Sequence, residues 1–173
     1  MKLNVRQYAV TDFPTLVPMA QEMHCNEDGV SHLTREQFAL TIDYFTQHTD
    51  CGKVLTLEYE NEICGYAILV FYWSNDWSGQ LIYLDELFIA ADFRNRGLGE
   101  LFLKWLRNEY RETAAALFLE TTPDKPRAAS LYQRFGFVPA ENAYWMYPFR
   151  IIKYPTDTSD ESVVQHTTAP GVA

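Results

Sequence analysis

The first half of the chain changes its hydrophobic period from that of helices to that of strands. After a short strand expected at residues 4–8, apolar residues recur at i, i+3, i+4 and i+7 from Leu16 to Met23, which predicts a helix beginning near residues 11–14. Thr34 and Gln37 form a capping-box pattern for a second helix. Three β-rich runs follow and predict an antiparallel meander, at 54–57, 63–73 and 81–89, with turns at 61–62 and 76–79.

The second half returns to the helical period. Gly97 opens an amphipathic helix, and a buried strand is expected at 115–119, so strand, helix and strand follow in the order of a parallel crossover. A last helix has apolar residues at the same spacing from Ala128 to Phe135 and is expected to end at Gly136. Short strands at 137–138 and 144–149 close the predicted fold.

These elements predict one α/β (α+β) domain over residues 1–153. We expect a mixed, mostly antiparallel sheet of about seven strands with about four flanking helices. Beyond Tyr154 the chain contains no aromatic residue and few aliphatic ones, so we expect a disordered tail over residues 154–173.

Composition and charge narrow the class of protein. The 173 residues are 47% hydrophobic and 15% aromatic, enough to bury a core, and the net charge of −9 repels phosphate backbones and attracts cations. The longest apolar run is far shorter than the ~20 residues of a membrane span, and the start lacks the apolar stretch of a signal peptide. We therefore expect a cytoplasmic protein that binds neither nucleic acid nor membrane. Three cysteines without paired spacing indicate neither a disulfide framework nor a thiolate metal site, and no metal is expected.

Candidate chemistry begins at the segment Arg94-Asn95-Arg96-Gly97-Leu98-Gly99, between a strand and a helix. Its glycines let main-chain N–H groups turn toward an anion, and its two arginines supply fixed positive charge. The segment lacks the Lys-Ser/Thr of a P-loop and the third glycine of the dinucleotide fingerprint. A phosphate cradle is one interpretation, and an ordinary tight turn with solvated arginines is the other.

Two motifs together resemble the GNAT superfamily of acyl-CoA-dependent N-acetyltransferases. They are Arg94-x-x-Gly97-x-Gly99 and, about thirty residues later, Arg127-Ala128-x-x-Leu131-Tyr132-x-x-x-Gly136-Phe137, within a resemblance that covers about Leu3 to Arg150. It implies acetyl-CoA as co-substrate, its pyrophosphate on the loop from Arg94 to Gly99, its pantetheine arm along the main chain of 87–89, and Tyr132 facing the sulfur. The implied cofactor-binding residues are Leu87, Phe88, Ile89, Arg94, Asn95, Arg96, Gly97, Leu98, Gly99, Glu100, Lys125, Arg127 and Ala128. Lys125 stands where the family often has Asn, and its ammonium group could contact a phosphate instead.

A closer resemblance is to the diamine (spermidine/spermine) N-acetyltransferase branch. It rests on the aromatic run from Tyr66 to Tyr72, on Trp77-x-Gly79 and on the run from Leu81 to Ile89, in which the paired acids stand in the order Asp85-Glu86. The resemblance implies a small polyamine or diamine as acceptor, and we expect a homodimer.

The paired acids suit acetyl transfer because the attacking amine must be neutral. An ammonium of pKa ~10.4 is about 3.4 units from its neutral form at pH 7, so a carboxylate or a carboxylate-held water must assist. Strand alternation sends Asp85 and Glu86 to opposite faces unless a bulge intervenes. We expect Asp85 to bind and deprotonate the cation, with Glu86 as helper; the alternative is a structural pair bound to an arginine.

The remaining candidates are an acid for the leaving thiolate and a wall for the acceptor. The Tyr132 phenol is expected to protonate the thiolate, with a core tyrosine as the alternative, and main-chain N–H groups near Leu87 are expected to bind the oxyanion. Trp77 could contact an alkyl ammonium through its ring, although such aromatics are more often core or dimer surface. Glu27 and Asp28 are expected at the acceptor's entry, in a loop whose histidines, His24 and His32, lack the spacing of metal ligands.

The sequence therefore predicts an enzyme that transfers acetyl from acetyl-CoA to a primary amine of a small cationic acceptor, by direct attack in a ternary complex. An aminoglycoside or amino-acid acetyltransferase is the first alternative, since those acceptors are also cations. A protein acetyltransferase is less favoured because the short N-terminal helical region leaves little grooved surface. A non-catalytic acyl-CoA sensor would need neither Tyr132 nor the paired acids.

Overall fold

The computed structural model describes residues 2–25, 31–121 and 125–139, within a compact unit that spans Met1–Asn142. Their elements are, in chain order, β1 (Leu3–Gln7), a 3-10 turn (Val10–Asp12), α1 (Phe13–Met23), α2 (Arg35–Gln47), β2 (Gly52–Tyr59), β3 (Glu62–Ser74), β4 (Gly79–Ile89), a second 3-10 turn (Ala91–Phe93), α3 (Leu98–Tyr110), β5 (Ala116–Leu119) and α4 (Pro126–Arg134). The predicted order of helices and strands is confirmed as far as α4.

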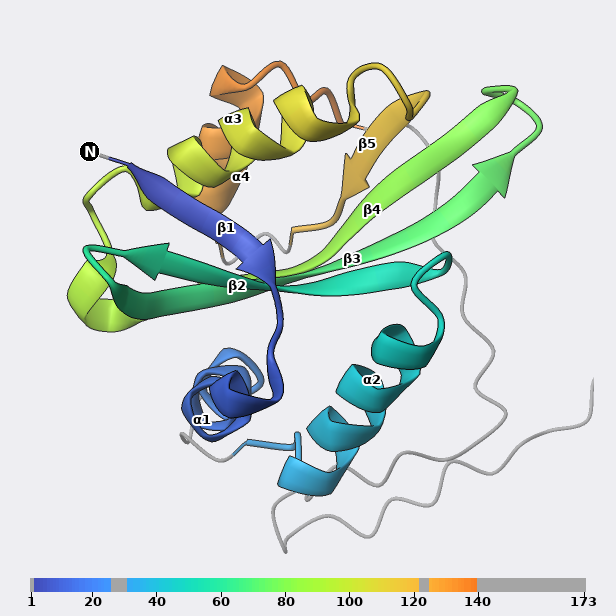
Figure 1. Ribbon diagram of the computed structural model, residues 1–173. Coiled ribbons are helices and arrows are strands. Elements are labelled where there is room, and N and C mark those ends of the chain that lie inside the picture. The colour runs from blue at the N-terminus through green and yellow to red at the C-terminus, as the bar shows by residue number, and fades with distance from the viewer. Residues whose placement is uncertain (1, 26–30, 122–124, 140–173) are drawn as a thin grey trace, which may run out of the picture. The chain divides into compact units, whose positions relative to one another are not determined.

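One mixed sheet organises this unit, with the strand order β1-β2-β3-β4-β5 (Figure 1). The first four strands form an antiparallel meander, and β5 lies parallel to β4 after the crossover through α3. Glu60 and Asn61, at φ 55 and 67, make the tight turn between β2 and β3, as a two-residue hairpin of this twist requires. The expected meander and parallel crossover are both confirmed.

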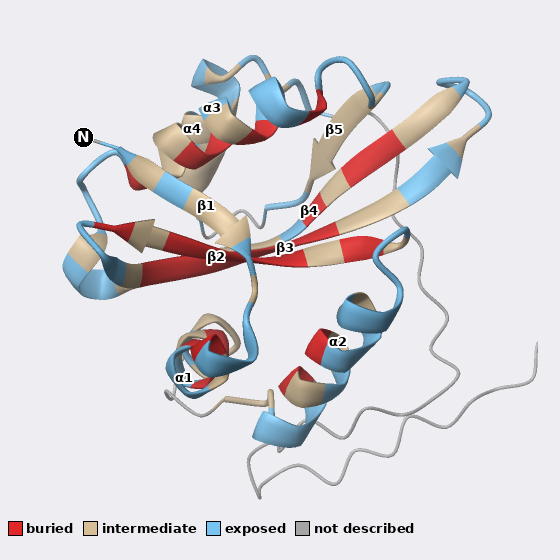
Figure 2. Ribbon diagram, in the orientation of Figure 1, coloured by how far each residue is buried: buried red, intermediate tan, exposed pale blue. Residues whose placement is uncertain are grey.

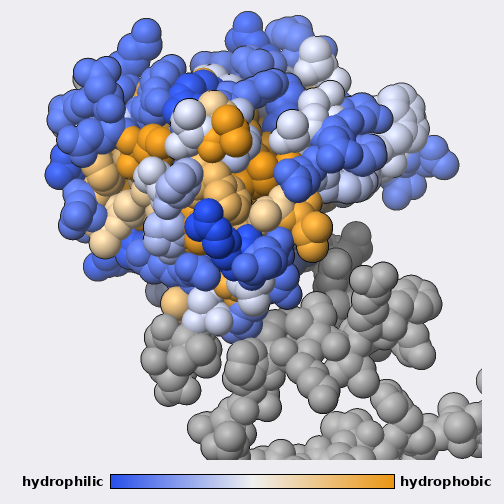
Figure 3. All heavy atoms as spheres, turned by 60° about the horizontal axis from the view of Figure 1, so that its bottom comes forward, coloured by the Kyte–Doolittle hydropathy of each residue, from blue (hydrophilic) through white to orange (hydrophobic). Residues whose placement is uncertain are grey.

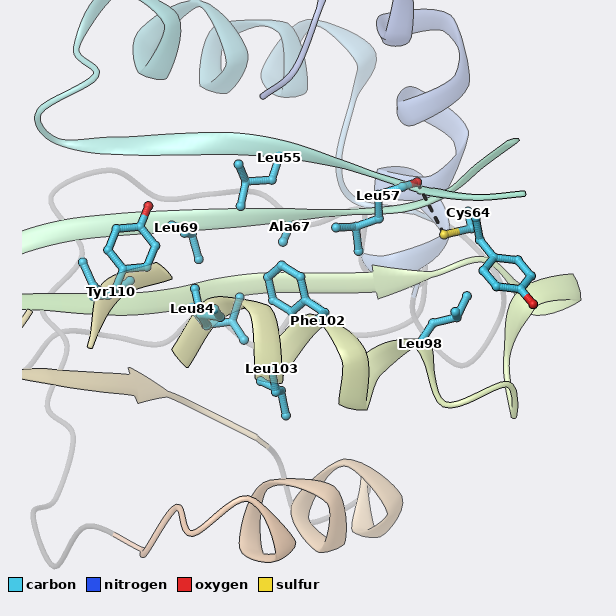
Figure 4. Packing of buried hydrophobic residues seen from close by; sticks show 13 residues of the cluster. Leu55, Leu57, Cys64, Ala67, Leu69, Leu84, Leu98, Phe102, Leu103 and Tyr110 are labelled. Carbon is cyan, nitrogen blue, oxygen red and sulfur yellow. Dashed lines mark hydrogen bonds between the residues drawn. The ribbon is translucent and has the colours of Figure 1, made fainter. Parts of the chain in front are cut away.

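Helices cover both faces of the sheet, and each face has its own core (Figure 2). On one face α3 contributes Leu98 and Phe102 to a cluster with Leu57 (Figure 4). Leu106 of α3 and Ile82 of β4 belong to the same cluster. On the other face α1 and α2 pack on the sheet around another set of buried residues, which includes Leu16, Phe38, Ile42, Tyr66, Ile68 and Phe88. The central strand β3 is therefore buried on both sides from Cys64 to Leu69, and β4 is buried at Leu81, Ile82, Leu84 and Phe88.

The described residues hold five strands rather than about seven. Residues 137–138 are not a strand, because the main chain there completes the end of α4: Phe137 N–H donates to Tyr132 O over 3.1 Å, and Gly136, at φ 86, donates to Gln133 O over 3.0 Å. This is the hydrogen-bond pattern of a Schellman cap. The strand expected at 144–149 and the tail expected at 154–173 lie outside the described residues.

The surface of this unit carries several large apolar side chains. The most exposed are Val10, Leu40, Trp73, Trp77 and Val138. The side of the unit that bears α1 and α2 shows hydrophobic residues set among hydrophilic ones (Figure 3). None of the helices in the described ranges is long and apolar enough to cross a membrane.

Candidate active site

A β-bulge at Asp85 sets the direction of the side chains in the second half of β4. Ile68 lies opposite Glu86 while its neighbour Leu69 lies opposite Leu84, so Asp85 is an extra residue on β4. Residues four apart on a regular strand share a face, yet Leu84 belongs to the core under α3 and Phe88 to the core under α1. The bulge therefore turns the side chains of Glu86 and Phe88 toward α1. The regular alternation of side chains along β4 is thus interrupted at Asp85.

Both carboxylate oxygens of Glu86 are engaged. The Tyr66 hydroxyl on β3 donates to Oε2 over 2.5 Å, and His24, which caps the C-terminus of α1, places Nε2 2.8 Å from Oε1. The Glu86 side chain is 14% exposed and that of His24 33%, whereas Tyr66 is fully buried. Three elements thus meet at one carboxylate, and two of its partners, His24 and Tyr66, were not predicted as site residues.

The electrostatics of this group follow from the Glu86 charge. Its hydrogen bond raises the pKa of His24 above 6.5, against the opposing effect of desolvation. Burial and, next, the Glu86 charge raise the pKa of the Tyr66 phenol well above its usual range. Tyr66 therefore remains a proton donor at every physiological pH.

Asp85 differs from its neighbour because its carboxylate makes no hydrogen bond or ion pair to another described residue. Asp85 is exposed by surface area, but the surrounding protein removes enough hydration to raise its pKa, and the charges of Glu86 and Glu120 raise it further against His24. Glu120, just past the end of β5, was not among the predicted site residues. Asp85 is thus the carboxylate available to a cationic ligand.

β4 and β5 part beside these acids. Their parallel ladder ends at the pair Leu84 and Leu119, while β4 continues to Ile89. The Ala90 N–H donates to Cys64 O on β3 over 2.9 Å, so alternation turns the main-chain groups of Leu87 and Ile89 away from β3. This open main-chain edge can pair with an extended arm that carries amide groups, as pantetheine does.

The predicted cradle forms the turn between this edge and α3. Asn95 and Gly97 adopt the left-handed conformation, at φ 63 and 74, and Gly97 is the N-cap of α3. Among the described residues the N–H groups from Leu98 to Glu100 meet no main-chain acceptor, as in any first helical turn. These donors and the helix dipole fit an anion such as a pyrophosphate.

The arginines and glycines of the cradle have distinct local roles. Arg94 donates to Ile89 O and to Glu22 Oε1, each over 2.8 Å, and Arg96 donates to Asp92 O over 2.9 Å. A Cβ on Gly97 would meet nothing within 4 Å, so its positive φ is what calls for glycine there. Gly99 instead allows close packing, because its Cβ would stand 3.3 Å from the Leu131 side chain of α4.

Tyr132 lies on α4, half-buried against the core under α3. Burial raises the pKa of its phenol, and its hydroxyl makes no hydrogen bond within the described ranges. Lys125 is the N-cap of the same helix, Arg127 and Ala128 belong to its first turn, and the Lys125 charge opposes the protonation of His24. The start of α4 therefore lies near the His24–Glu86 pair.

Of the other predicted acceptor residues, the structure describes only Trp77, and it lies far from these acids. Trp77 is 54% exposed in the β3–β4 turn, with its ring edge-on to Phe118 at 6.0 Å. Seven residues of strand, ~23 Å at ~3.3 Å each, separate Gly79 from Glu86. Glu27 and Asp28 lie outside the described residues. In the described part of the chain no three His, Cys, Asp or Glu side chains are grouped as metal ligands.

Known proteins share this architecture. The spermine/spermidine N(1)-acetyltransferase of Bacillus subtilis (strain 168) is 26% identical over 143 residues, 79% of this chain and 88% of that protein. An integron cassette protein from the Cole Harbour Salt Marsh metagenome superimposes with a TM-score of 0.71 at 22% identity, over 84% of this chain and 90% of that one. An aminoglycoside N-acetyltransferase in complex with CoA gives 0.67 at 16% identity, over 86% and 96%. The two structures demonstrate a shared fold.

A family model identifies the family to which this chain belongs. The model of the acetyltransferase (GNAT) family matches residues 17–137, which contain the bulge, the cradle and Tyr132. That span is most of the chain and includes part of α1 and every element from α2 to α4. The resemblance noted in the sequence is thereby confirmed: the chain belongs to the GNAT family of acetyltransferases.

Proposed function

We propose that this enzyme transfers acetyl from acetyl-CoA to a primary amine of a small polyamine or diamine, by direct attack in a ternary complex. One observation carries the proposal: beside Glu86, where β4 parts from β5, Asp85 presents a carboxylate that no other described residue binds. An acceptor amine bound to Asp85 would lie next to the open edge of Leu87. In this proposal the acetyl donor binds where the fold of the family provides its site, and the acceptor binds at the paired acids.

The charge around Asp85 favours an acceptor with more than one ammonium group. Glu86 and Glu120 act on Asp85 with the same sign, and the whole chain has a net charge of −9. A second ammonium group on the acceptor is attracted by the same negative charges, and this attraction requires no close-fitting contact with the surface. The spermine/spermidine acetyltransferase named above is the relative that supports this acceptor class.

The reaction needs two proton transfers, one from the attacking amine and one to the departing thiolate. Acetyl-CoA supplies a thioester, whose acetyl carbon forms the new C–N bond as the C–S bond breaks. Asp85 takes the amine proton, directly or through water, and its raised pKa makes it a stronger base than an ordinary aspartate. The Tyr132 phenol gives a proton to the departing thiolate, and the Leu87 N–H faces the side on which an oxyanion would be stabilised.

Replacing Asp85 tests this assignment. Because one group holds the ammonium and takes its proton, Asp85→Asn is expected to raise KM for the polyamine and to lower kcat, with KM for acetyl-CoA unchanged. CoA-thiol release is the measurement. Glu112→Gln is the control, since Glu112 is exposed and, among the described residues, is paired only with its neighbour Arg111. Wild-type kinetics in Asp85→Asn would overturn the role of Asp85.

A further inference from the structure

His24 and Tyr66 have no role in the reaction as derived so far, although they hold a carboxylate next to the proposed base. The Tyr66 ring is fixed in the core between Phe38 and Phe88, at centroid distances of 5.7 and 6.0 Å. The Tyr66 hydroxyl on β3 is therefore fixed in position, and through its hydrogen bond it fixes Oε2 of Glu86 on β4. His24 holds Oε1 from the opposite side and, being one-third exposed, can exchange its proton with solvent.

We propose that His24 is a specificity-determining residue of acetyl transfer: its imidazolium offsets the charge of Glu86, and loss of its proton increases the negative charge that a cationic acceptor meets beside Asp85. The inference rests on the proposed function, because it concerns the affinity for that acceptor. Tyr66 keeps Glu86 in place in both protonation states, so the change is one of charge rather than of position.

The groups that face His24 give the direction of the effect. Glu86 and Asp85 from β4 favour its protonation, Lys125 at the start of α4 opposes it, and the His32 ring lies 6.4 Å away, edge-on. Since the acids prevail, the imidazole titrates above its ordinary value. When the pH rises through the raised pKa of His24, the imidazolium loses its positive charge. The surroundings of the acceptor become more negative, so KM for a polycation should fall.

The test is the ratio of polyamine KM in His24→Gln to that in the wild type, measured at several pH values. Glutamine keeps an N–H donor for Oε1 but carries no titrating proton. Dividing by the wild type removes the titration of the amine itself. At about pH 6 the ratio should be about one-third or less, the effect of one unit charge several ångströms away, and it should approach one as the pH rises above the pKa of His24. KM for acetyl-CoA should not change.

A residue with a merely structural role would raise the ratio above one at every pH. That result, or a ratio independent of pH, would overturn the inference. If no polyamine is acetylated the proposed acceptor is wrong, and the same ratio is then measured with whichever amine is the substrate. The two failures are thereby distinguished.

An NMR titration tests the His24–Glu86 coupling without any activity. The chain has four histidines, and the imidazole signal lost in His24→Gln identifies His24. In the wild type its pKa should lie above 6.5, and Glu86→Gln should lower it toward or below that value. An unchanged His24 titration in Glu86→Gln would contradict the coupling and with it the inference.

Discussion

Tyr66 donates to Glu86 along a diagonal of the β3–β4 ladder, since Tyr66 pairs directly with Phe88 and Glu86 with Ile68. Diagonal neighbours of this kind can touch only when their side chains share a face. They do so because the bulge at Asp85 reverses the alternation of β4. One inserted residue therefore joins a core tyrosine to the acids of the proposed acceptor site.

Tyr66→Phe should lower the free energy of unfolding by about 1.5–3 kcal/mol, the range for a hydrogen bond to a charged group. The ring stays in the core, so packing is preserved. Tyr110→Phe is the matched control, because Tyr110 is also buried and its hydroxyl has no hydrogen-bond partner in the described ranges. Urea unfolding compares the two, and equal losses would show that the Tyr66–Glu86 bond is not specially stabilising.

Gly97→Val should abolish the rise in Tm that acetyl-CoA gives the wild type. The valine side chain has space, but φ 74 is strained for a β-branched residue, so the first turn of α3 must rearrange. Gly136→Val carries a similar strain at φ 86, also with open space, at the end of α4. The control should lose stability yet keep the ligand-induced shift; a full shift in Gly97→Val would refute the cradle.

Tyr132→Phe should leave the Kd for acetyl-CoA near that of the wild type and lower kcat by about 10²-fold or more, the usual contribution of a positioned acid. Its hydroxyl makes no hydrogen bond within the described ranges, so little stability depends on it. Steady-state kinetics and calorimetric binding measure the two effects separately. A kcat within twofold of wild type would make Tyr132 a core residue only.

Asp12 should make the protein sensitive to acid. Arg6 binds it through two hydrogen bonds of 2.6 and 2.8 Å, Thr56 adds another, and the Arg6 guanidinium lowers the pKa of Asp12 from 3.8 to about 2. Because the folded pKa is depressed, about 2 kcal/mol of stability is present above pH 3.8 and is lost as the pH falls toward 2.

Asp12→Asn should accordingly cost about 2–4 kcal/mol at pH 7, and the gap to wild type should narrow by about 2 kcal/mol at pH 2. Denaturant unfolding at the two pH values is the measurement. Glu100→Gln, which removes the exposed pair with Lys104, should cost less than about 0.5 kcal/mol at either pH. A gap independent of pH would show that the Asp12 charge does not stabilise the fold.

Local patterns in the sequence were enough for most of the fold. The capping box at Thr34 and Gln37 is formed, with both hydrogen bonds present, and the three β-rich runs correspond to the three long strands. The strand predicted at 137–138 is wrong because the apolar residues there complete a helix cap rather than a strand ladder. Local hydrophobicity is the same in both cases.

The candidate site was only half predictable, for a physical reason. The cradle is contiguous in sequence, so its glycines could be recognised. The His24–Glu86 contact joins residues 62 apart, and it depends on a bulge that only the pairing of β3 with β4 reveals. No local pattern around His24 distinguishes it from a solvated loop histidine.

The comparison that tests the acceptor most directly is kcat/KM for spermidine, a monoamine and an aminoglycoside, each at low and high salt. Attraction of a polycation by several carboxylates is screened over a Debye length of about 10 Å at 0.1 M salt. We expect spermidine to exceed the monoamine and the aminoglycoside at low salt, with an advantage that shrinks as salt rises. A monoamine or aminoglycoside that exceeds spermidine, or a ranking and rates that salt leaves unchanged, would contradict the proposal.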